Sequence, residues 1–307
     1  MSKKVKVIAL FISDVHLSLT PPIWRSNEPD WLAAQQRPFD ELKELQEELG
    51  GPPIFCAGDL FDRWNSPPEL INWAMKHLPY MHCIPGQHDL PDHDLSQIHR
   101  SAYWTLVSAS VIHDMRDGRT YSIDQFVNDK EVCVHEFPFG VEVKPPKNQK
   151  HFSVALIHEY HWINSTGYKG APQESHAGNL TSMVRGYKWI VCGDNHLPFL
   201  TQGFWNCGCF IRRKSDEEYY KPSIGMLTET GQMLPHSLDL SEDKHLNVED
   251  WEHKTRSSQD PTFLEDLEAL DSATVDFRDA LQRYIRDHRT DLAIKREIMK
   301  ALPNEQA

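Results

Sequence analysis

The sequence predicts an α/β fold of four layers, in which helices cover the outer faces of two stacked β-sheets (α/β/β/α), with a small helical extension at the C-terminus. Apolar runs of strand length alternate with amphipathic segments over the first two-thirds of the 307 residues. Turn signals then divide residues 198–239 into β-hairpins, which we expect to be strands of the second sheet. The composition becomes polar near residue 240. We therefore expect a layered domain over residues 1–240, a polar linker over 241–259 and the helical extension over 260–307.

Each predicted strand is a short apolar run. Residues 5–13 form the longest run and are expected to be the first core strand. Two helices should follow: one over 38–49, which ends at a Gly-Gly pair, and one over 67–78, which opens with two prolines. Further buried strands are predicted at 53–57, 81–84, 152–157 and 188–192.

The C-terminal extension carries the signals of short amphipathic helices. Asp260 suits an N-cap, and Pro261 suits the first helical position. Three groups of apolar residues at helical spacing begin at Phe263, Phe277 and Ile294. Their apolar faces must be buried against the domain, a second copy of the chain or another protein.

The composition is ordinary for a globular protein, but the charge is strongly negative. Hydrophobic residues make up 39% of the chain, and the formal net charge is −13. This charge disfavours nonspecific attraction to nucleic acids. It does not exclude a nucleic-acid enzyme, because bound divalent cations and local basic clusters can supply the attraction.

The cysteine pattern and the apolar runs favour a cytoplasmic protein without membrane association. The six cysteines form no CxxC pair and no disulfide spacing. No run of about 18 apolar residues exists, so no transmembrane helix is expected. The N-terminal apolar run leads into polar motif residues instead of a cleavage site, so we interpret it as a core strand and not as a signal peptide.

Five polar motifs follow the predicted strands. Open α/β sheets gather their ligands at the carboxyl ends of strands, so we expect the motifs to converge. Carboxylate, imidazole and amide groups are the donors that two hard or borderline metal ions require. Each motif alone is common in turns, but their joint occurrence indicates a binuclear metal centre. The motifs are Asp14-Val15-His16, Gly58-Asp59-Leu60-Phe61-Asp62, Gly86-Gln87-His88-Asp89, His158, and Gly193-Asp194-Asn195-His196.

These residue types indicate hydrolysis of a phosphoester. Two metal ions about 3.5–4 Å apart lower the pKa of a shared water and clamp the phosphate. Asp59 is the candidate bridging carboxylate, and Asp14 and His16, two residues apart on an extended segment, are placed to chelate one ion. His88, with Asp89 as the partner that orients its ring, suits the catalytic acid that protonates the leaving alkoxide.

The order of the motifs resembles the signature of the calcineurin-like metallophosphoesterases over about residues 7–200. The form Gly58-Asp59-Leu60-Phe61-Asp62 is further similar to that of the SbcD-type exonucleases, the double-strand-break repair nucleases that work with a coiled-coil ATPase. This resemblance implies the four-layer phosphoesterase fold, a metal-dependent DNA exonuclease or endonuclease activity, and a compact, phage-type member. It also implies two divalent metal ions, with Mn²⁺ first and Mg²⁺ or Fe²⁺ as alternatives. The implied partners are DNA, an SbcC-type coiled-coil ATPase and a second copy of the chain.

The resemblance also assigns the ligands of each ion. His88 would be the acid that binds no metal. His158 is preferred to His161 as a ligand because it directly ends an apolar strand. One ion would be held by Asp14, His16, Asp59 and His196, and the other by Asp59, Gln87, His158 and Asp194.

Two positions depart from the family pattern. Gln87 stands where Asn is usual, and Asp194 stands where His is usual. Three carboxylates against two divalent ions leave one formal positive charge, whereas the usual pattern leaves two. We therefore expect a harder second site that prefers manganese or magnesium to zinc. The alternative is that Asp194 is not a ligand and the second site is weak.

Substrate contacts are less constrained by the sequence. Candidates are His161, which follows His158 by three residues, and Arg212 and Arg213, which belong to the densest basic cluster. Such a cluster is more often a solvated surface than a phosphate site. Besides the nuclease, the residues leave open a phosphoprotein phosphatase or small-molecule phosphodiesterase of the same fold. They also leave open a binding module whose substituted ligands have weakened catalysis.

Overall fold

The computed structural model describes residues 5–116, 120–164, 166–168, 170–217 and 219–246. The first structural unit of the chain ends at Leu246. The helices expected within residues 260–307, and the part of the expected linker beyond residue 246, lie outside the described residues.

The first β-sheet has the strand order β12-β11-β1-β2-β3-β4. Strands β1 to β4 run parallel, while β11 pairs antiparallel with β1 and β12 pairs antiparallel with β11. The parallel strands therefore all end at the same edge of the sheet. The strands are β1 (Val7–Ile12), β2 (Ile54–Cys56), β3 (Met81–Cys83), β4 (Ile112–Asp114), β11 (Ser223–Thr228) and β12 (Met233–Ser237).

The second sheet has the order β5-β6-β7-β8-β10-β9. Strands β6, β7, β8 and β10 run parallel, and the edge strands β5 and β9 are antiparallel to their neighbours. The strands are β5 (Tyr121–Val127), β6 (Lys130–Phe137), β7 (Phe152–His158), β8 (Trp189–Gly193), β9 (Phe199–Thr201) and β10 (Phe204–Asn206).

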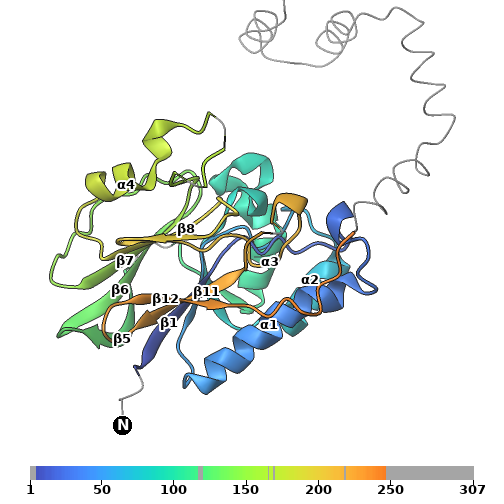
Figure 1. Cartoon of the computed structure of the whole chain (residues 1–307), viewed down its shortest axis with the longest axis horizontal. Helices are drawn as coiled ribbons and strands as arrows, with labels where there is room; N and C mark the ends of the chain where they lie inside the picture. The colour runs from blue at the N-terminus through green and yellow to red at the C-terminus, as the bar shows by residue number, and fades with distance from the viewer. Residues whose placement is uncertain (1–4, 117–119, 165, 169, 218, 247–307) are drawn as a thin grey trace, which may run out of the picture. The chain divides into compact units, whose positions relative to one another are not determined.

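Helices cover the two outer faces, which confirms the predicted α/β/β/α layers (Figure 1). Helices α1 (Trp31–Glu48), α2 (Pro68–His77) and α3 (Ala102–Ser108) pack on the first sheet, and α4 (Ala177–Met183) packs on the second. Short segments of 3₁₀ helix occur at Ile23–Arg25, Gln87–Asp89, Pro91–His93, Leu95–Arg100, Gln173–Ser175 and Ser215–Glu217.

Strand β1 shows how one apolar run contributes to two layers of core. Its side chains alternate between the two faces of the sheet. Leu10 and Ile12 pack under the helices, whereas Phe11 faces the second sheet. The cluster between the sheets continues through Phe55, Leu156, Val191, Trp205 and Leu227. A strand buried on both faces reads as the continuous apolar run found in the sequence.

Helix α1 begins seven residues before the predicted start at residue 38. Asp30 caps the helix, because its carboxylate accepts a hydrogen bond from the Ala33 backbone N–H at 3.0 Å. Pro38 therefore lies inside the helix and not in its first turn. The additional turns bury Trp31 and Gln35.

The prediction that residues 198–239 all belong to the second sheet is wrong for half of them. The hairpin of β9 and β10 joins the second sheet, but β11 and β12 join the first. The cause is the register of β11, which places Met226 opposite Leu10 of β1. Strands β4, β5 and β6 had no counterpart in the sequence prediction.

The first six residues of the predicted linker, 241–246, pack against the domain. The Asp243 carboxylate lies 2.9 Å from the Arg25 guanidinium and 3.0 Å from that of Arg37. Arg25 also pairs with Glu28 at 2.6 Å, and Leu246 is buried. A buried arginine requires such partners, because an unpaired buried charge is strongly destabilising.

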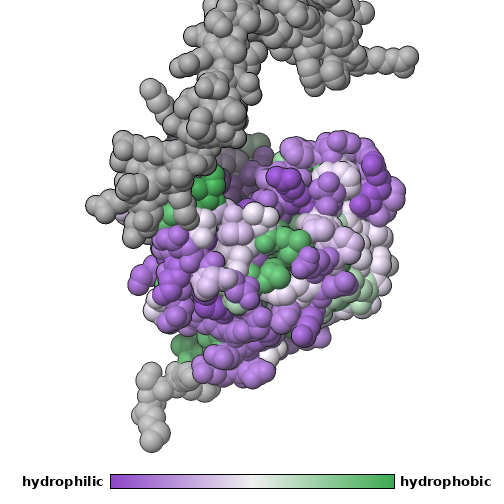
Figure 2. Space-filling model, turned by 90° about the vertical axis from the view of Figure 1, so that its right-hand side faces the viewer, coloured by the Kyte–Doolittle hydropathy of each residue, from purple (hydrophilic) through white to green (hydrophobic). Residues whose placement is uncertain are grey.

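The surface seen from the side in Figure 2 is largely hydrophilic, with apolar residues in small groups. Scattered apolar groups of this kind are ordinary on folded domains. Within the described part of the chain, no helix combines the length and the apolar character that a membrane crossing requires.

Candidate metal centre

The predicted ligands all follow strands that end at one edge of the two sheets. Asp14 and Asp59 come two and three residues after β1 and β2, and the 3₁₀ turn Gln87–Asp89 follows β3. From the second sheet, His158 is the last residue of β7, and Asp194 comes directly after β8. Because β7 and β8 pair in parallel with His158 beside Gly193, the last two motifs are neighbours.

The loops that carry the ligands are hydrogen-bonded to one another. The backbone N–H of Asp14 donates to the Gly58 carbonyl, and that of His16 donates to the Asp59 carbonyl, each at 3.0 Å. Asp14, His16, Asp59 and Asp194 all have positive φ angles, of 50°, 51°, 54° and 85°. Backbone strain of this kind persists where the surrounding structure fixes it, and it concentrates at functional sites.

The first group of donors consists of Asp14, His16 and His196. Nε2 of His16 lies 3.0 Å from Nε2 of His196 and 3.8 Å from Oδ1 of Asp14. Nε2 of His196 lies 3.9 Å from the same Asp14 oxygen. One donor atom from each residue therefore lies within 4.8 Å of the other two, which is the spacing needed to surround one ion.

Asp59 stands between this group and a second one. Its Oδ2 atom is 3.7 Å from Nε2 of His16 and 3.5 Å from Nε2 of His158. Asp14, Asp59 and His158 together also place donor atoms within 4.8 Å of one another. Asp59 therefore lies between the two groups of donors, where a bridging carboxylate would have to lie.

Several predicted ligand atoms are buried without a hydrogen-bond partner. Among the described residues, these atoms include Oδ2 of Asp59, Nε2 of His158 and Oε1 of Gln87. Buried polar atoms are almost always paired, so each exception needs an explanation. A divalent cation would accept lone pairs from all three, and the residues present therefore fit a metal centre.

The two departures from the family pattern contact each other. Nε2 of Gln87 donates a hydrogen bond of 2.7 Å to Oδ1 of Asp194. This bond occupies the amide nitrogen of Gln87. The amide oxygen then points to the buried side, where it has no hydrogen-bond partner. The backbone N–H of Asp194 in turn lies 3.1 Å from both oxygens of Asp14.

The electrostatics of the centre are dominated by burial and by close pairs of acids and histidines. Burial raises the pKa of Asp14 to about 6, although His158 and His196 partly oppose the shift. Burial also acts to raise the pKa of Asp59, but the adjacent His158 and His16 outweigh it and hold that pKa well below its ordinary value. Burial lowers the pKa of His16. These shifts favour an ionised Asp59 carboxylate and a neutral His16 imidazole, the forms that bind metal. Burial acts to lower the pKa of His158 as well, but the adjacent Asp59 outweighs it and raises that pKa, so an ion would have to displace a proton there.

A second layer of residues holds these ligands, and the sequence had indicated none of it. Glu217 is buried, and its carboxylate lies 3.0 Å from Nδ1 of His196. The Ser13 hydroxyl donates to Asp14 at 2.6 Å, and Nδ1 of His158 lies 2.5 Å from the Ala57 carbonyl. Such partners fix the ring orientation and tautomer of a metal ligand. The position of Ser13 next to Asp14 was a usable signal, but Glu217 had none.

Close packing around His158 explains why glycine is present in two of the motifs. A Cβ atom on Gly58 would overlap the imidazole ring of His158. A Cβ atom on Gly86 would overlap Oδ1 of Asp59 and lie 2.6 Å from Nε2 of His158. The motif glycines therefore leave the space that the ligands occupy.

His88 lies at the rim of the centre, and its orientation differs from the prediction. Nδ1 of His88 lies 2.8 Å from the Asp62 carbonyl, and Nε2 lies 4.0 Å from Oδ2 of Asp59. The sequence led us to expect that the Asp89 carboxylate orients this ring, but the carboxylate makes other contacts. It accepts backbone N–H bonds from Leu60, Phe61 and Gly86 at 3.0–3.1 Å and so fixes the Asp59 loop.

The three predicted substrate contacts separate in the structure. His161 is buried, with its ring nitrogens 3.0 Å from the Ser175 carbonyl and 3.3 Å from Glu159, so it braces a loop instead of offering a free nitrogen. The Arg212 guanidinium turns away into contacts with Asp243 and His245. Arg213 alone faces the centre, where its charge acts on the pKa of His16. Arg213 also donates to Asp62 at 2.7 Å.

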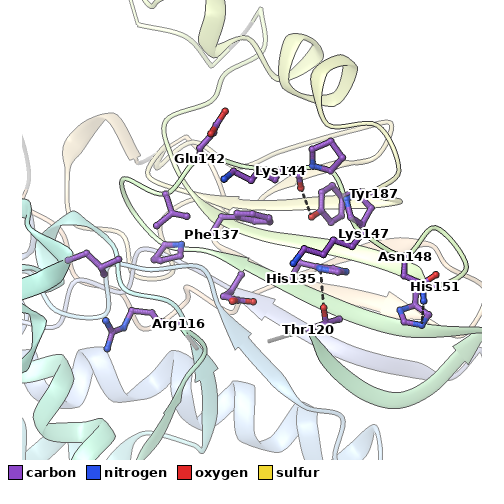
Figure 3. Close-up of a pocket in the computed structure, with 16 residues that line it drawn as sticks. Arg116, Thr120, His135, Phe137, Glu142, Lys144, Lys147, Asn148, His151 and Tyr187 are labelled. Atoms are coloured by element: carbon purple, nitrogen blue, oxygen red, sulfur yellow. Dashed lines mark hydrogen bonds between the residues drawn. The ribbon is translucent and has the colours of Figure 1, made fainter. Parts of the chain in front are cut away.

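Two pockets with shared lining residues lie beside the centre and the second sheet, and we refer to them together as the groove. A pocket of about 520 Å³ is lined by the ligands His158 and Asp194 together with Phe139 and Tyr160. It shares Phe137, Val141 and Glu142 with a neighbouring pocket of about 440 Å³. Figure 3 shows the second pocket, with Lys144, Lys147 and Arg116 around it.

One family model and several solved structures match this chain. The model of the calcineurin-like phosphoesterase family matches residues 9–202. A comparison with curated proteins gives no match. The sulfate thiohydrolase SoxB of Thermus thermophilus, solved with glycerol, is similar with a TM-score of 0.43 and 11% identity over 85% of this chain and 61% of that one. A proposed 5′-nucleotidase of Staphylococcus aureus, solved with α-ketoglutarate, gives a TM-score of 0.43 and 11% identity over 81% and 57%. The NAD nucleotidase NadN of Haemophilus influenzae gives 0.37 and 14% over 79% and 54%. The chain thus spans between 54% and 61% of the length of these structures.

Proposed function

The chain belongs to the calcineurin-like phosphoesterase family, and from this membership we propose that it is a manganese-dependent DNA nuclease of the SbcD type. Metal-dependent hydrolysis of phosphoesters is the chemistry that family membership indicates. The nuclease specificity and the metal are the proposal. Three features support it: the donor set, the position of His88 and the groove along the second sheet.

The donor set is the observation that carries the proposal. Three predicted ligands of the second ion, Asp59, His158 and Gln87, each present a buried atom without a partner. Leaving such an atom unpaired costs about 1–3 kcal/mol, so an ion that pairs all three is strongly favoured. Two divalent ions bound here would supply a water of lowered pKa and positive charge against the phosphoryl oxygens. The first would be held by Asp14, His16, Asp59 and His196, and the second by Asp59, Gln87, His158 and Asp194.

His88 is positioned to serve as the acid. Its side chain is 42% exposed, so a substrate can reach it from the groove side. The contact of Nδ1 with the Asp62 carbonyl requires a proton on that nitrogen and directs Nε2 toward the centre. A protonated Nε2 can then transfer its proton to the leaving alkoxide, as general acid catalysis requires. Arg213, which is held by Asp62, adds a fixed positive charge on the same side.

The groove supports a polymeric substrate. It begins at two metal ligands, passes the aromatic rings of Phe139 and Tyr160, and reaches the lysines Lys144 and Lys147. Aromatic side chains that stack on bases, combined with cations along a backbone, are typical of single-stranded nucleic acid sites. Local cations of this kind offset the net charge of −13.

The preference for manganese rests on the charge of the donor set. With Asp194 in place of a histidine, the centre has three carboxylates, and the second site has mainly oxygen donors. Oxygen donors suit manganese and magnesium, whereas nitrogen and sulfur donors suit zinc. The 2.7 Å bond from Gln87 holds Asp194 beside the second site and supports its role as a ligand.

The first test is an assay of the purified full-length chain on labelled single- and double-stranded linear DNA with manganese. We expect degradation that a chelator abolishes and that falls about 10²–10⁴-fold in His88→Ala. His99→Ala removes an exposed histidine outside the centre and serves as the matched control. Both variants should bind two metal ions per chain, measured by calorimetry.

A second candidate is a phosphodiesterase or phosphatase for small substrates. The acidic residues Glu142 and Glu159 on the groove wall favour it, because they repel a polyanion. Hydrolysis of bis-p-nitrophenyl phosphate or p-nitrophenyl phosphate by wild type, with DNA left intact, would replace the nuclease by this candidate. Loss of metal binding in His88→Ala would instead make His88 a ligand. Failure of wild type to bind two ions would favour a binding module.

The resemblance to SbcD-type nucleases also leads us to propose a coiled-coil ATPase and a second copy of the chain as partners, and a cytoplasmic location. The last proposal agrees with the six cysteines, all of which are free. Size-exclusion chromatography with light scattering would test self-association.

A further inference from the structure

A second cluster of metal-binding side chains lies in the second sheet and contains no residue of the catalytic centre. Glu131 and Cys133 are on β6, and His151 immediately precedes β7. One donor atom from each of the three lies within 4.8 Å of the other two. We propose that these residues form a separate structural site for a zinc-like ion, distinct from the catalytic pair of ions.

The spacing of the donors fits such an ion. Sγ of Cys133 lies 3.2 Å from Nδ1 of His151, which is the ring nitrogen that would bind the ion. The other ring nitrogen, Nε2, lies 2.9 Å from the Asn148 side-chain nitrogen and 3.7 Å from Oε2 of Glu131. In a tetrahedral zinc site with a Zn–S bond of about 2.3 Å and a Zn–N bond of about 2.0 Å, two such ligands are separated by roughly 3.5 Å. Only small shifts are needed to surround an ion.

The sheet holds the donors in this arrangement before any ion binds. Glu131 and Cys133 are two residues apart on one strand, so their side chains lie on the same face. Cys133 pairs with Ser122 of β5 and with Ser153 of β7. The Ser122 hydroxyl donates to Glu131 at 2.5 Å, which is the outer support that metal ligands usually have.

Access and charge also suit a bound cation. Cys133 is buried, whereas the His151 and Glu131 side chains are 27% and 38% exposed, so an ion can enter from solvent. On binding, the Cys133 thiol would release its proton to solvent. A thiolate, a carboxylate and a neutral imidazole then balance a divalent ion, and water can complete the fourth position.

The donor types select a different metal from that of the catalytic centre. A thiolate and an imidazole favour zinc over manganese or magnesium. The proposed catalytic ligands include no sulfur. The ion would connect β6 to residue His151. His151 and Asn148 belong to the segment that lines the pocket shown in Figure 3.

Cobalt is the probe that separates the two sites, because a cobalt–thiolate bond gives a charge-transfer absorption in the near ultraviolet. We expect the metal-free full-length chain to develop this absorption on titration with Co²⁺ and to lose it completely in Cys133→Ser. Glu131→Gln and His151→Gln change partly exposed side chains and should also lose it, which keeps the test valid if Cys133→Ser does not fold. Ser122→Ala should weaken binding about 10–100-fold.

Two control variants assign the signal. Asp59→Asn disrupts the catalytic centre and should keep the absorption. Cys209→Ser removes the thiol nearest to His196 and Glu217 and should keep it too. The proposal is overturned if wild type shows no absorption, or if the absorption survives in Cys133→Ser or disappears in Cys209→Ser. These readouts do not depend on whether the chain cuts DNA.

Discussion

Gln87 and Asp194 are joined by a hydrogen bond of 2.7 Å between the amide nitrogen of one and the carboxylate of the other, across 107 residues of sequence. Each of them is a departure from the family pattern, and in the structure they form one unit. The bond directs the Gln87 oxygen inward and keeps the Asp194 carboxylate at the groove. Burial acts to lower the pKa of His158, but Asp59 outweighs it, and Asp14 and Asp194 add smaller contributions that raise that pKa further.

Substitution of Asp194 by Asn should weaken manganese activation. The change removes one of three carboxylates from the centre. The amide that replaces this carboxylate also has only one oxygen, so an oxygen that accepts the hydrogen bond from the Gln87 amide is less available to the ion. We expect the manganese concentration for half-maximal activity to rise about tenfold or more, which corresponds to about 1.4 kcal/mol. Asp129→Asn, an exposed position with the same residue types, is the control. An unchanged manganese requirement would show that Asp194 is not a ligand.

Glu217 should act through His196. Its carboxylate also accepts the backbone N–H groups of Arg213 and Lys214, so Glu217→Gln keeps the shape of the site while removing the charge behind the ring. We expect metal affinity to fall about 10–100-fold, measured by calorimetry, with little change in the unfolding midpoint of the metal-free protein. Glu174→Gln, at an exposed position, should leave affinity as in wild type.

An added methyl group at Gly86 should disturb the centre directly. The Cβ atom would overlap the Asp59 carboxylate, which is held by the backbone and cannot move freely. Gly86→Ala should therefore lose binding of at least one of the two ions. Gly140→Ala meets no atom within 4 Å, although its φ of 79° adds strain, so it should bind both ions. Equal metal stoichiometry in the two variants would contradict the packing described for Gly86.

The stability of the protein should depend on pH through His82, which lies in β3 away from the ligands. Burial, with a smaller effect from His113, lowers the pKa of His82 to about 4. Its ring also meets Tyr121, whose hydroxyl is 3.0 Å from Nε2, and packs against Phe55 and Tyr80. Between pH 6.5 and about 4 the unfolded chain binds a proton that the folded protein does not, so stability falls as pH falls through this range.

We expect the His82 effect to reach about 1–2 kcal/mol, less than the full shift because solvent screens part of it. Urea unfolding of wild type and His82→Phe in chelator at pH 4, 5, 6 and 7 measures it. The difference between the two proteins removes the contribution of Asp14, which also titrates in this range. A constant difference across the series would show that His82 does not contribute.

Much of the site was predictable because its residues follow buried strands. A continuous apolar run such as that of β1 indicates both a strand and the point where the strand ends. The positions of Asp14, Asp59 and His158 could therefore be predicted. The partition of the hairpins could not, because the pairing of β11 with β1 depends on contacts more than 200 residues apart in sequence. Glu217 was missed because only the path of the chain between residues 196 and 217 brings its carboxylate to His196. The contacts that His161 and Arg212 make with Ser175 and Asp243 could not be foreseen, because a sequence does not show which buried partners a polar side chain has.

The left-handed backbone at Asp14, His16, Asp59 and Asp194 restricts which residues can replace these ligands. Metal chemistry admits aspartate, glutamate, histidine and amides at such positions. Backbone conformation admits glycine and, among residues with side chains, mainly asparagine, aspartate and histidine. Only the overlap of the two sets satisfies both demands, and glutamate, the nearest chemical relative of aspartate, falls outside it. The exchange of histidine for aspartate at position 194 stays inside this overlap, so the centre can change its charge without any change in the path of its chain.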